Sequence, residues 1–534
     1  MVIKNSMLLS GNEAVALAAL DSGVRLGAGY PGTPSTEILE EFAELGGQAQ
    51  WSSNEKVALE TAIGVSWGGG RALVTMKHVG LNVAADPLFT VAYTGVAAGL
   101  VLVSADDPGM ASSQNEQDNR RYAQAAGVPM LEPSDSQESY DFARAAFTLS
   151  EEFAVPVLLR ITTRICHSKT VVRRAPAAAV PSARSYERDI PGRVMIPAYA
   201  RPAHRRLREK LRRIQQWSEK SNLNQEFEGD FSLGIITSGI SFMHAREAAP
   251  HAAFLKLGVT YPPPIERMRA FASCVKRCRI IEEGDPYLVE AARTAGIAVE
   301  DKPEPFRFGE LTVSRVRRML AGETIEPEAA AGGTPPRLCP TCPHRQVFMA
   351  LSRLGCIVAG DIGCYTLGVL PPFEAMDSCV CMGASIGVGL GLRHALSREQ
   401  ARRVVSVIGD STFIHSGITG LVDMAYNAPE TGHVVIILDN GTTAMTGLQE
   451  HPGTGRALDH SPANRVVIED IARAMGIPNV HVVDPTEGAD HLEALVRRSL
   501  DAEQLTVIIA RHPCALLEKK TQSGGQAAAT CAGT

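Results

Sequence analysis

The sequence has no long hydrophobic run and no excess of positive charge. Its longest apolar stretch, Val91 to Ala105, is broken by Tyr93, Thr94 and two glycines, so it falls short of a membrane span. Lysine and arginine number 52 against 58 aspartate and glutamate, which gives a formal charge of −6 and no basic footprint for nucleic acid. The apolar patch in Met1 to Ser10 is too short for a secretion signal. We therefore expect a cytoplasmic protein that binds neither membranes nor nucleic acid.

The sequence also lacks the cysteine pattern of a disulfide framework or of a metal cluster. It has 11 cysteines, and their spacing includes one C-x-x-C, at Cys339 and Cys342. Neither the C-x₂-C-x₂-C run of a ferredoxin nor the doubled C-x-x-C of a zinc ribbon is present. We interpret the cysteines as reduced packing residues. Metal binding by Cys339 and Cys342 is the less favoured alternative.

With 534 residues, the chain is too long for one hydrophobic core. Strand-like β-branched runs alternate with helical patterns, which is typical of parallel α/β sheets. Segments rich in proline and alanine interrupt this alternation. The predicted fold class is α/β with three doubly wound, parallel-sheet units. The predicted division is a first α/β unit over 1–175, a linker with a basic amphipathic helix over 176–229, a second unit over 230–325, a third over 337–515 and a flexible tail over 516–534.

The predicted linker contains a basic helix. Leu207, Leu211 and Ile214 recur at helical spacing among arginines and lysines. Most such segments are solvated amphipathic helices. Docking of a partner subunit or of an anionic substrate tail is the alternative.

Two apolar runs that end in polar residues organise the third unit. They cover 403–412 and 433–440, and the segment between them is long enough for one crossover helix. Their polar ends are Gly409, Asp410 and Ser411 on the first and Asp439 and Asn440 on the second. Asp410 and Asn440 offer hard oxygens to Mg²⁺, and Gly409 lets the backbone approach a phosphate. The pattern resembles a thiamine diphosphate signature, with an ordinary strand and turn as the alternative.

Thiamine chemistry also needs a carboxylate that these two runs lack. A glutamate hydrogen-bonded to N1′ of the aminopyrimidine favours the imino tautomer, which removes the thiazolium C2 proton. Glu55 begins a predicted helix over 54–64, and we expect Gly64 to allow close helix packing. Glu60 lies on another side of that helix and suits a structural role. A rigid turn at 30–35 can present the Thr33 hydroxyl.

Several longer motifs resemble the alpha subunits of indolepyruvate ferredoxin oxidoreductases. The resemblance extends from about residue 6 to 515. It is carried by the motifs Tyr30–Glu37, Trp51–Glu60, Met76–Pro87, Ala105–Gly109, Ser112–Asp118, Cys339–Arg345 and Gly360–Thr366. It implies that the three units are a pyrimidine-binding domain, a transketolase C-terminal-like domain and a diphosphate-binding domain. It also implies oxidative decarboxylation of an aryl 2-oxo acid, such as indolepyruvate or phenylpyruvate, to an acyl-CoA, with a smaller beta subunit as partner.

The resemblance assigns roles to individual residues. It implies that Glu55 activates N1′ of thiamine diphosphate and that Thr33 faces substrate or cofactor. Asp410, Asn440 and the Thr442 carbonyl become Mg²⁺ ligands beside Gly409 and Ser411. Met382 is expected to prop the bent cofactor, with a plain core methionine as the alternative. The remaining expected members are the loop residues Asp361, Gly363 and Cys364, which border the cofactor, and His78 and His415, which bind the substrate carboxylate or transfer protons.

The sequence departs from the resemblance near its end. The family usually continues into a domain with two sets of ferredoxin-type cysteines, whereas here the last cysteine, Cys531, stands alone. We therefore expect no iron–sulfur cluster in this chain and a separate iron–sulfur or flavin electron carrier. The alternatives are a cluster-free decarboxylase or carboligase and a non-catalytic scaffold. Because the two halves of a thiamine site usually meet across a chain interface, we also expect a dimer of alpha chains or of alpha–beta pairs.

Overall fold

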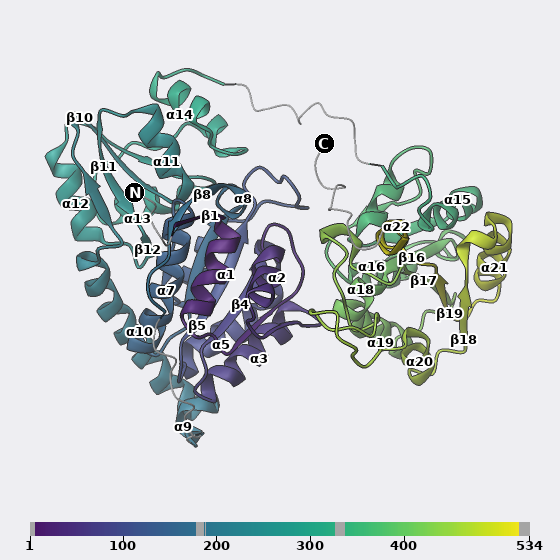
Figure 1. Ribbon diagram of the computed structural model, residues 1–534. Coiled ribbons are helices and arrows are strands. Elements are labelled where there is room, and N and C mark those ends of the chain that lie inside the picture. The colour runs from purple at the N-terminus through teal and green to yellow at the C-terminus, as the bar shows by residue number, and fades with distance from the viewer. Residues whose placement is uncertain (1–5, 178–185, 187, 326–336, 523–534) are drawn as a thin grey trace. The chain divides into compact units, whose positions relative to one another are not determined.

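The computed structural model describes residues 6–177, 186, 188–325 and 337–522, and the chain divides into two compact units at residues 331 and 332. A seven-stranded sheet organises the first unit (Figure 1). All neighbouring strands in it are parallel except the edge pair β12 and β6. In spatial order the strands are β12 (Val259–Tyr261), β6 (Met130–Leu131), β7 (Val157–Thr162), β5 (Leu100–Asp106), β4 (Ala72–Lys77), β2 (Leu26–Gly29) and β3 (Ala49–Trp51).

The central strands are mostly apolar because helices cover the sheet. All of β5 and β7 is buried. The helices of this region are α1 (Gly11–Asp21), α2 (Thr36–Glu44), α3 (Glu55–Trp67), α4 (His78–Val83), α5 (Ala85–Thr94), α6 (Arg120–Ala126), α7 (Ser136–Phe153) and α8 (Thr163–His167). A small antiparallel pair, β1 (Ser6–Ser10) and β8 (Lys169–Arg173), lies beside α1 and α7. The carboxyl ends of β2 and β5 lead directly into the turns at 30–35 and 107–119, and β4 leads directly into α4.

The first unit also contains a four-stranded sheet. Its strands in spatial order are β13 (Cys278–Ile281), β10 (Asp230–Ser238), β11 (Ala252–Leu257) and β9 (Gln225–Phe227), of which only β9 is antiparallel to its neighbour. The helical elements around it are α11 (Gly239–Ala248), α12 (Ile265–Cys274), α13 (Tyr287–Thr294), η1 (Glu304–Arg307) and α14 (Val313–Leu320). Strand β12 follows β11 yet joins the seven-stranded sheet, so one segment contributes to both sheets.

The basic helix predicted from the sequence is present and is longer than expected. Short helix α9 (Ile190–Arg193) precedes α10 (Pro197–Lys220), which contains the predicted segment. Leu207, Leu211 and Ile214 are buried, while the arginines between them lie at the surface. The amphipathic prediction is therefore confirmed for this helix.

A buried ion network joins the two sheets of the first unit. The Arg120 guanidinium binds Asp118 beside it at 2.6 Å and Glu282 at the end of β13 at 2.5 Å. Arg160 on β7 binds Asp106 at 2.7 Å and Glu132 at 3.0 Å. Because removal of one partner would leave an uncompensated charge, this network ties the segment 278–285 to the first sheet.

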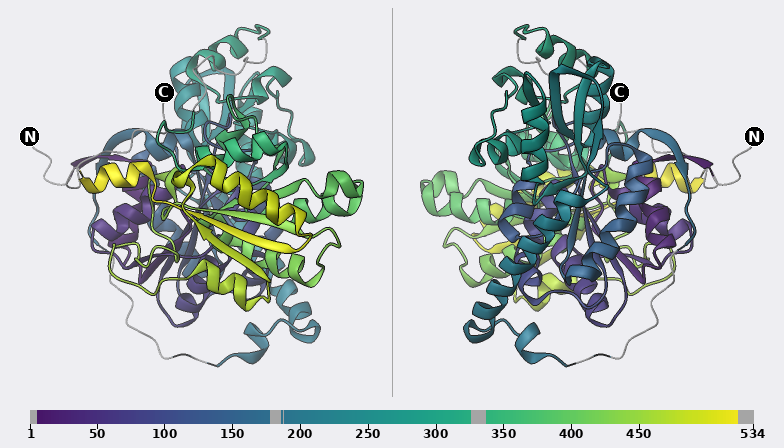
Figure 2. Two further views of the ribbon diagram at one scale, coloured as in Figure 1. Left: turned by 90° about the vertical axis from the view of Figure 1, so that its right-hand side faces the viewer. Right: turned by 90° about the vertical axis from the view of Figure 1, so that its left-hand side faces the viewer.

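A fully parallel six-stranded sheet organises the second unit. Its strands in spatial order are β15 (Ser378–Cys379), β14 (Ile357–Gly360), β16 (Val404–Gly409), β17 (His433–Asp439), β19 (Leu505–Arg511) and β18 (Asn479–Val483). Alternate residues of β16, β17 and β19 enter two different core clusters, one on each face. Helices therefore cover both faces of the sheet (Figure 2, left).

The helices of the second unit pack on the two faces of this sheet. One cluster includes α15 (His344–Leu354) and α21 (Ala489–Asp501), and the other includes α16 (Ala384–Ala395), α19 (Ile418–Tyr426) and α20 (Ile468–Ala474). The other helical elements are η2 (Cys364–Val369), α17 (Arg398–Ala401), α18 (Asp410–Thr412), the π-helical turn η3 (Phe413–Gly417), η4 (Ala444–Thr446), η5 (Pro485–Glu487) and α22 (Ala515–Gln522). The α/β fold class and its predominantly parallel sheets are confirmed.

Candidate functional site

Asp410 and Asn440 leave the carboxyl ends of neighbouring parallel strands. Strand β16 ends at Gly409 and Asp410 begins α18, whereas β17 ends one residue before Asn440. The two strands are paired in parallel register up to Gly409 and Leu438, and α19 forms the expected crossover between them. In an open parallel sheet, this edge is where ligands bind.

Asp410 presents a buried carboxylate at this edge. Its Oδ1 accepts the Ser411 N–H at 2.8 Å, and its Oδ2 accepts the Gly441 N–H at 2.9 Å. Burial favours the protonated form, but the imidazole of His451 and these two amides outweigh burial and hold the pKa of Asp410 below its usual range. The residue is therefore an anionic oxygen ligand in an enclosed place, as a metal–diphosphate site requires.

Two neighbours orient the amide of Asn440. Its Nδ2 donates to Nε2 of His344 at 3.3 Å, and its Oδ1 accepts the Thr442 N–H at 3.1 Å. Burial lowers the pKa of His344 to about 4, so its imidazole is neutral and can accept. Oδ1 keeps a second lone pair that can bind a metal ion. His344 lies in the Cys339–Arg345 motif, but no sequence pattern indicated its contact with Asn440.

The glycines of this region make room for Tyr365. A Cβ atom at Gly409 would lie 2.6 Å from the Tyr365 ring, and one at Gly363 would lie 2.2 Å from it. The Tyr365 hydroxyl donates to the Ile362 carbonyl at 2.9 Å. This packing accounts for both glycines within the unit, and a phosphate contact at Gly409 stays a prediction.

Asp361 fixes the loop that carries Met382. Its buried carboxylate accepts the backbone N–H groups of Ile362, Gly383 and Ser385, each at 2.9 Å. The carboxylate is thus engaged by the protein backbone, and it joins the end of β14 to the start of α16. Met382 is half-buried and belongs to none of the core clusters. Met382 is therefore not a core methionine here, and its contact with the cofactor stays a prediction.

Four cysteines from three segments influence one another electrostatically. Burial, together with the thiols of Cys339 and Cys514, raises the pKa of Cys342 to about 11. Burial and the same neighbours also raise the pKa of Cys364. In the part of the chain that the structure describes, no three cysteine, histidine or acidic side chains are arranged to hold a metal ion. The sequence did not predict this convergence.

The two histidines named from the sequence are buried and already engaged. Nε2 of His78 lies 3.0 Å from the Asn115 carbonyl, and burial lowers the pKa of this imidazole. Nδ1 of His415 lies 2.6 Å from the Ser416 hydroxyl within η3. Both contacts are typical of structural histidines, and a role for either in proton transfer stays a prediction.

Glu55 is a buried carboxylate at the first turn of α3. Asn54 caps this helix by accepting the Val57 N–H at 3.0 Å, which is why the helix begins at Glu55. A Cβ atom at Gly80, in α4, would lie 2.5 Å from Glu55 Oε1. The expectation for Gly64 is wrong, because a Cβ there would meet nothing within 4 Å. Gly80, which the sequence did not single out, provides the close approach.

Two other residues that the sequence singled out in this region are Glu60 and Thr33. Glu60 is exposed and pairs with Lys56, as its structural assignment predicted. The turn that carries Thr33 is held by Asn12 of α1, whose side-chain amide donates to the Pro34 carbonyl at 2.8 Å. It is also closed by a bond from the Gly32 N–H to the Thr36 hydroxyl at 2.9 Å. Thr33 therefore lies on a rigid turn, as expected.

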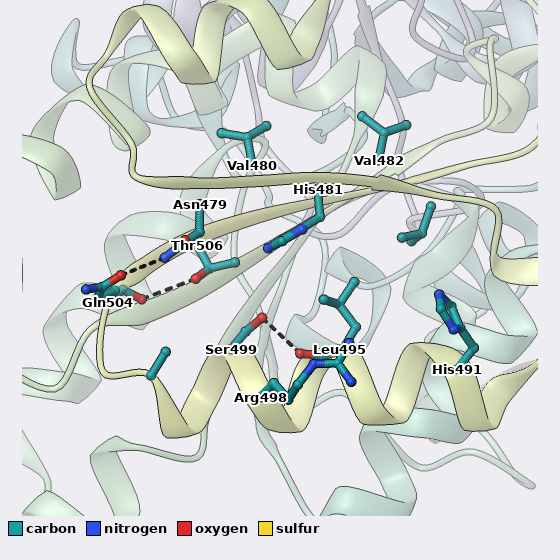
Figure 3. Close-up of a pocket in the computed structure, with 12 residues that line it drawn as sticks. Asn479, Val480, His481, Val482, His491, Leu495, Arg498, Ser499, Gln504 and Thr506 are labelled. Atoms are coloured by element: carbon teal, nitrogen blue, oxygen red, sulfur yellow. Dashed lines mark hydrogen bonds between the residues drawn. The ribbon is translucent and has the colours of Figure 1, made fainter.

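A separate hollow of about 500 Å³ lies between β18, β19 and α21. Figure 3 shows its polar side chains, which include His481 on β18 and His491 and Arg498 on α21. None of the predicted site residues lines this hollow. The chemistry predicted from the sequence therefore does not use it.

The segment that contains Glu55 and the segment that contains Asp410 and Asn440 each match a known protein family. Residues 17–218 match the family model for pyruvate flavodoxin/ferredoxin oxidoreductase, thiamine diphosphate-binding, and residues 361–510 match that for the thiamine pyrophosphate enzyme, C-terminal TPP binding domain. A 2-oxoglutarate:ferredoxin oxidoreductase from Magnetococcus marinus has a similar fold, with a TM-score of 0.50 and 16% sequence identity over 60% of this chain and 65% of that one. No helix in the described ranges has the length and apolar character that a bilayer crossing requires.

Relatives with higher identity extend over nearly the whole chain. The indolepyruvate oxidoreductase subunit IorA of Archaeoglobus fulgidus is 42% identical, over 96% of this chain and 87% of its own length. The corresponding subunit of Pyrococcus abyssi is 39% identical, over 96% of this chain and 86% of its own length. With this extent of similarity, the chain belongs to the IorA family of indolepyruvate oxidoreductase subunits, which are thiamine diphosphate-dependent 2-oxo acid oxidoreductases.

Proposed function

We propose that this protein catalyses the oxidative decarboxylation of an aryl 2-oxo acid, of the indolepyruvate or phenylpyruvate type, to the acyl-CoA. The observation that carries the proposal is the placement of Asp410 and Asn440 at adjacent strand ends, within the segment that matches the thiamine pyrophosphate-binding family. The names of the relatives in Archaeoglobus fulgidus and Pyrococcus abyssi support the aryl substrate class.

The residues of the second unit would hold the metal and the diphosphate. Asp410, Asn440 and the Thr442 carbonyl supply three hard oxygens for Mg²⁺. His344 and the Thr442 N–H keep the Asn440 oxygen in position before any ligand arrives. Met382 and the loop at 361–364 would border the cofactor beyond its diphosphate. Because these oxygens are already held in position, less conformational entropy is lost when the metal binds.

Glu55 would hold the proton that starts the reaction. When bound, thiamine diphosphate supplies the carbanion that attacks the 2-oxo group and the electron sink for decarboxylation. The Glu55 carboxylate is buried at the start of α3. From there it can share a proton with N1′ of an aminopyrimidine. Thr33, on its rigid turn, would present its hydroxyl to substrate or cofactor.

Completion of this reaction requires partners. CoA would accept the acyl group, and a smaller beta subunit together with an iron–sulfur or flavin carrier would accept the electrons. We also propose a dimer of alpha chains or of alpha–beta pairs, as the sequence predicted. Sedimentation of the purified complex checks this assembly, and a monomeric active species would contradict it.

Product analysis tests the proposed function. Purified protein with thiamine diphosphate, Mg²⁺ and indole-3-pyruvate or phenylpyruvate is assayed for CO₂, aldehyde and acyl-CoA, with and without CoA and a one-electron dye. We expect acyl-CoA only when CoA and dye are both present, and slower turnover of the aliphatic control 2-oxoglutarate. Release of aldehyde without any acceptor would instead identify a non-oxidative decarboxylase or carboligase.

A further inference from the structure

A loop after β17 returns the chain to Asp410. The Thr443 N–H donates to the Gln449 carbonyl at 2.9 Å, and the Thr442 hydroxyl donates to the same oxygen at 3.2 Å. These bonds close the loop, and two residues later His451 lies with Nε2 3.3 Å from Asp410 Oδ2. A residue 41 positions from Asp410 thereby reaches the predicted metal and diphosphate site.

The hydrogen bonds of His451 define where its proton is. Nδ1 accepts the Gly453 N–H at 3.1 Å, so in the neutral ring the proton is on Nε2. Only 4% of the residue is exposed, and Nε2 has no hydrogen-bond partner in the described chain. Nε2 is close enough to Asp410 Oδ2 for a hydrogen bond, but the two groups are not oriented to form one. His451 therefore holds a buried donor next to the carboxylate without a matching acceptor.

The protein keeps this arrangement although a buried unsatisfied donor is costly. A Cβ atom at Gly453 would lie 2.9 Å from Cε1 of His451, so glycine at this position makes room for the imidazole. Asp410 does not need His451 for its own orientation, because the Ser411 and Gly441 amides already bind both carboxylate oxygens. His451 favours the anionic form of Asp410, but it is not needed to orient that carboxylate.

We propose that Nε2–H of His451 donates a hydrogen bond to a phosphate oxygen of the diphosphate that is bound beside Asp410. The inference rests on the proposed function, because it takes Asp410 as the metal ligand of thiamine diphosphate. An anionic oxygen there would satisfy the donor, and a donor that is fixed in advance loses little entropy on binding. His451 is thus a phosphate-binding residue of the cofactor site.

Calorimetric titration of cofactor-free protein with thiamine diphosphate and with unphosphorylated thiamine, in the presence of Mg²⁺, tests the proposal without any activity assay. His451→Ala is expected to raise the Kd for thiamine diphosphate about tenfold to a hundredfold and to reduce the preference for thiamine diphosphate over thiamine. In His451→Gln, the side-chain amide N–H lies near the place of Nε2–H, so most of the affinity should return. His460→Ala is the matched control, because His460 is on the same loop with a side chain 63% exposed.

The outcomes separate this proposal from the proposed function. Unchanged affinity in folded His451→Ala would overturn it, as would a His451→Gln protein that binds no better than the alanine variant. An equal loss for thiamine diphosphate and unphosphorylated thiamine would also overturn it, since that result indicates a structural role. If Asp410→Ala binds thiamine diphosphate like the wild type, the site of the proposed function fails instead.

Discussion

Glu55 has so little space beside Gly80 that one added methyl group is expected to displace its carboxylate. In Gly80→Ala the new Cβ would lie 2.5 Å from Oε1, whereas ordinary contacts begin at 3.4 Å, so the carboxylate must move by about 0.9 Å. Misplacement of a catalytic group by about 1 Å costs on the order of 100-fold in rate. We therefore expect kcat to fall about 100-fold, which corresponds to about 2.7 kcal/mol of transition-state stabilisation.

The cofactor assay distinguishes this effect from misfolding. Gly80 is in a helix, where alanine is favoured over glycine by about 1 kcal/mol, so the variant should fold and bind thiamine diphosphate nearly as the wild type does. Gly64→Ala in α3 is the matched control, because its Cβ meets nothing, and it should keep full turnover. Turnover in Gly80→Ala equal to that of Gly64→Ala would refute the reasoning about Glu55.

Two further predictions concern stability. Arg120→Ala should lower the free energy of unfolding by about 3–5 kcal/mol, since it leaves Asp118 and Glu282 buried without their partner; Arg121→Ala, which breaks an exposed pair, should cost less than about 1 kcal/mol in the same urea titration. Burial lowers the pKa of His344 to about 4 from 6.5, so the unfolded chain binds the proton more readily between these values. The stability that neutral His344 contributes should be complete above pH 6.5 and should fall by up to about 1.4 kcal/mol per pH unit toward pH 4. Urea titrations across this range should therefore show that the free energy of unfolding depends less steeply on pH in His344→Gln than in the wild type.

The elements that carry the site were predictable because their signals are local. β16 and β17 are β-branched runs that end in small polar residues, and both occur where the sequence placed them. The start of α3 followed from Asn54, a strong capping residue immediately before the apolar helical pattern. Local patterns of this kind determine where an element begins and what lies at its end.

The contacts that refine the site depend on folding over long distances in sequence. Gly64 looked like the packing glycine of α3, yet Gly80, on the next helix, lies against Glu55. His451 reaches Asp410 only because a closed loop returns the chain to β16. Arg120 and Glu282, 162 residues apart, pair across two sheets. Contacts between residues so far apart in the chain leave no periodic pattern in the sequence from which they could be predicted.

Glu55 is proposed to start the chemistry on thiamine diphosphate that Asp410 and Asn440 hold through Mg²⁺. The Glu55→Ala variant tests this role, with turnover of an aryl 2-oxo acid and calorimetric binding of thiamine diphosphate measured on the same preparation. Turnover is expected to be lost while the cofactor still binds with Mg²⁺. Full turnover in this variant would contradict it.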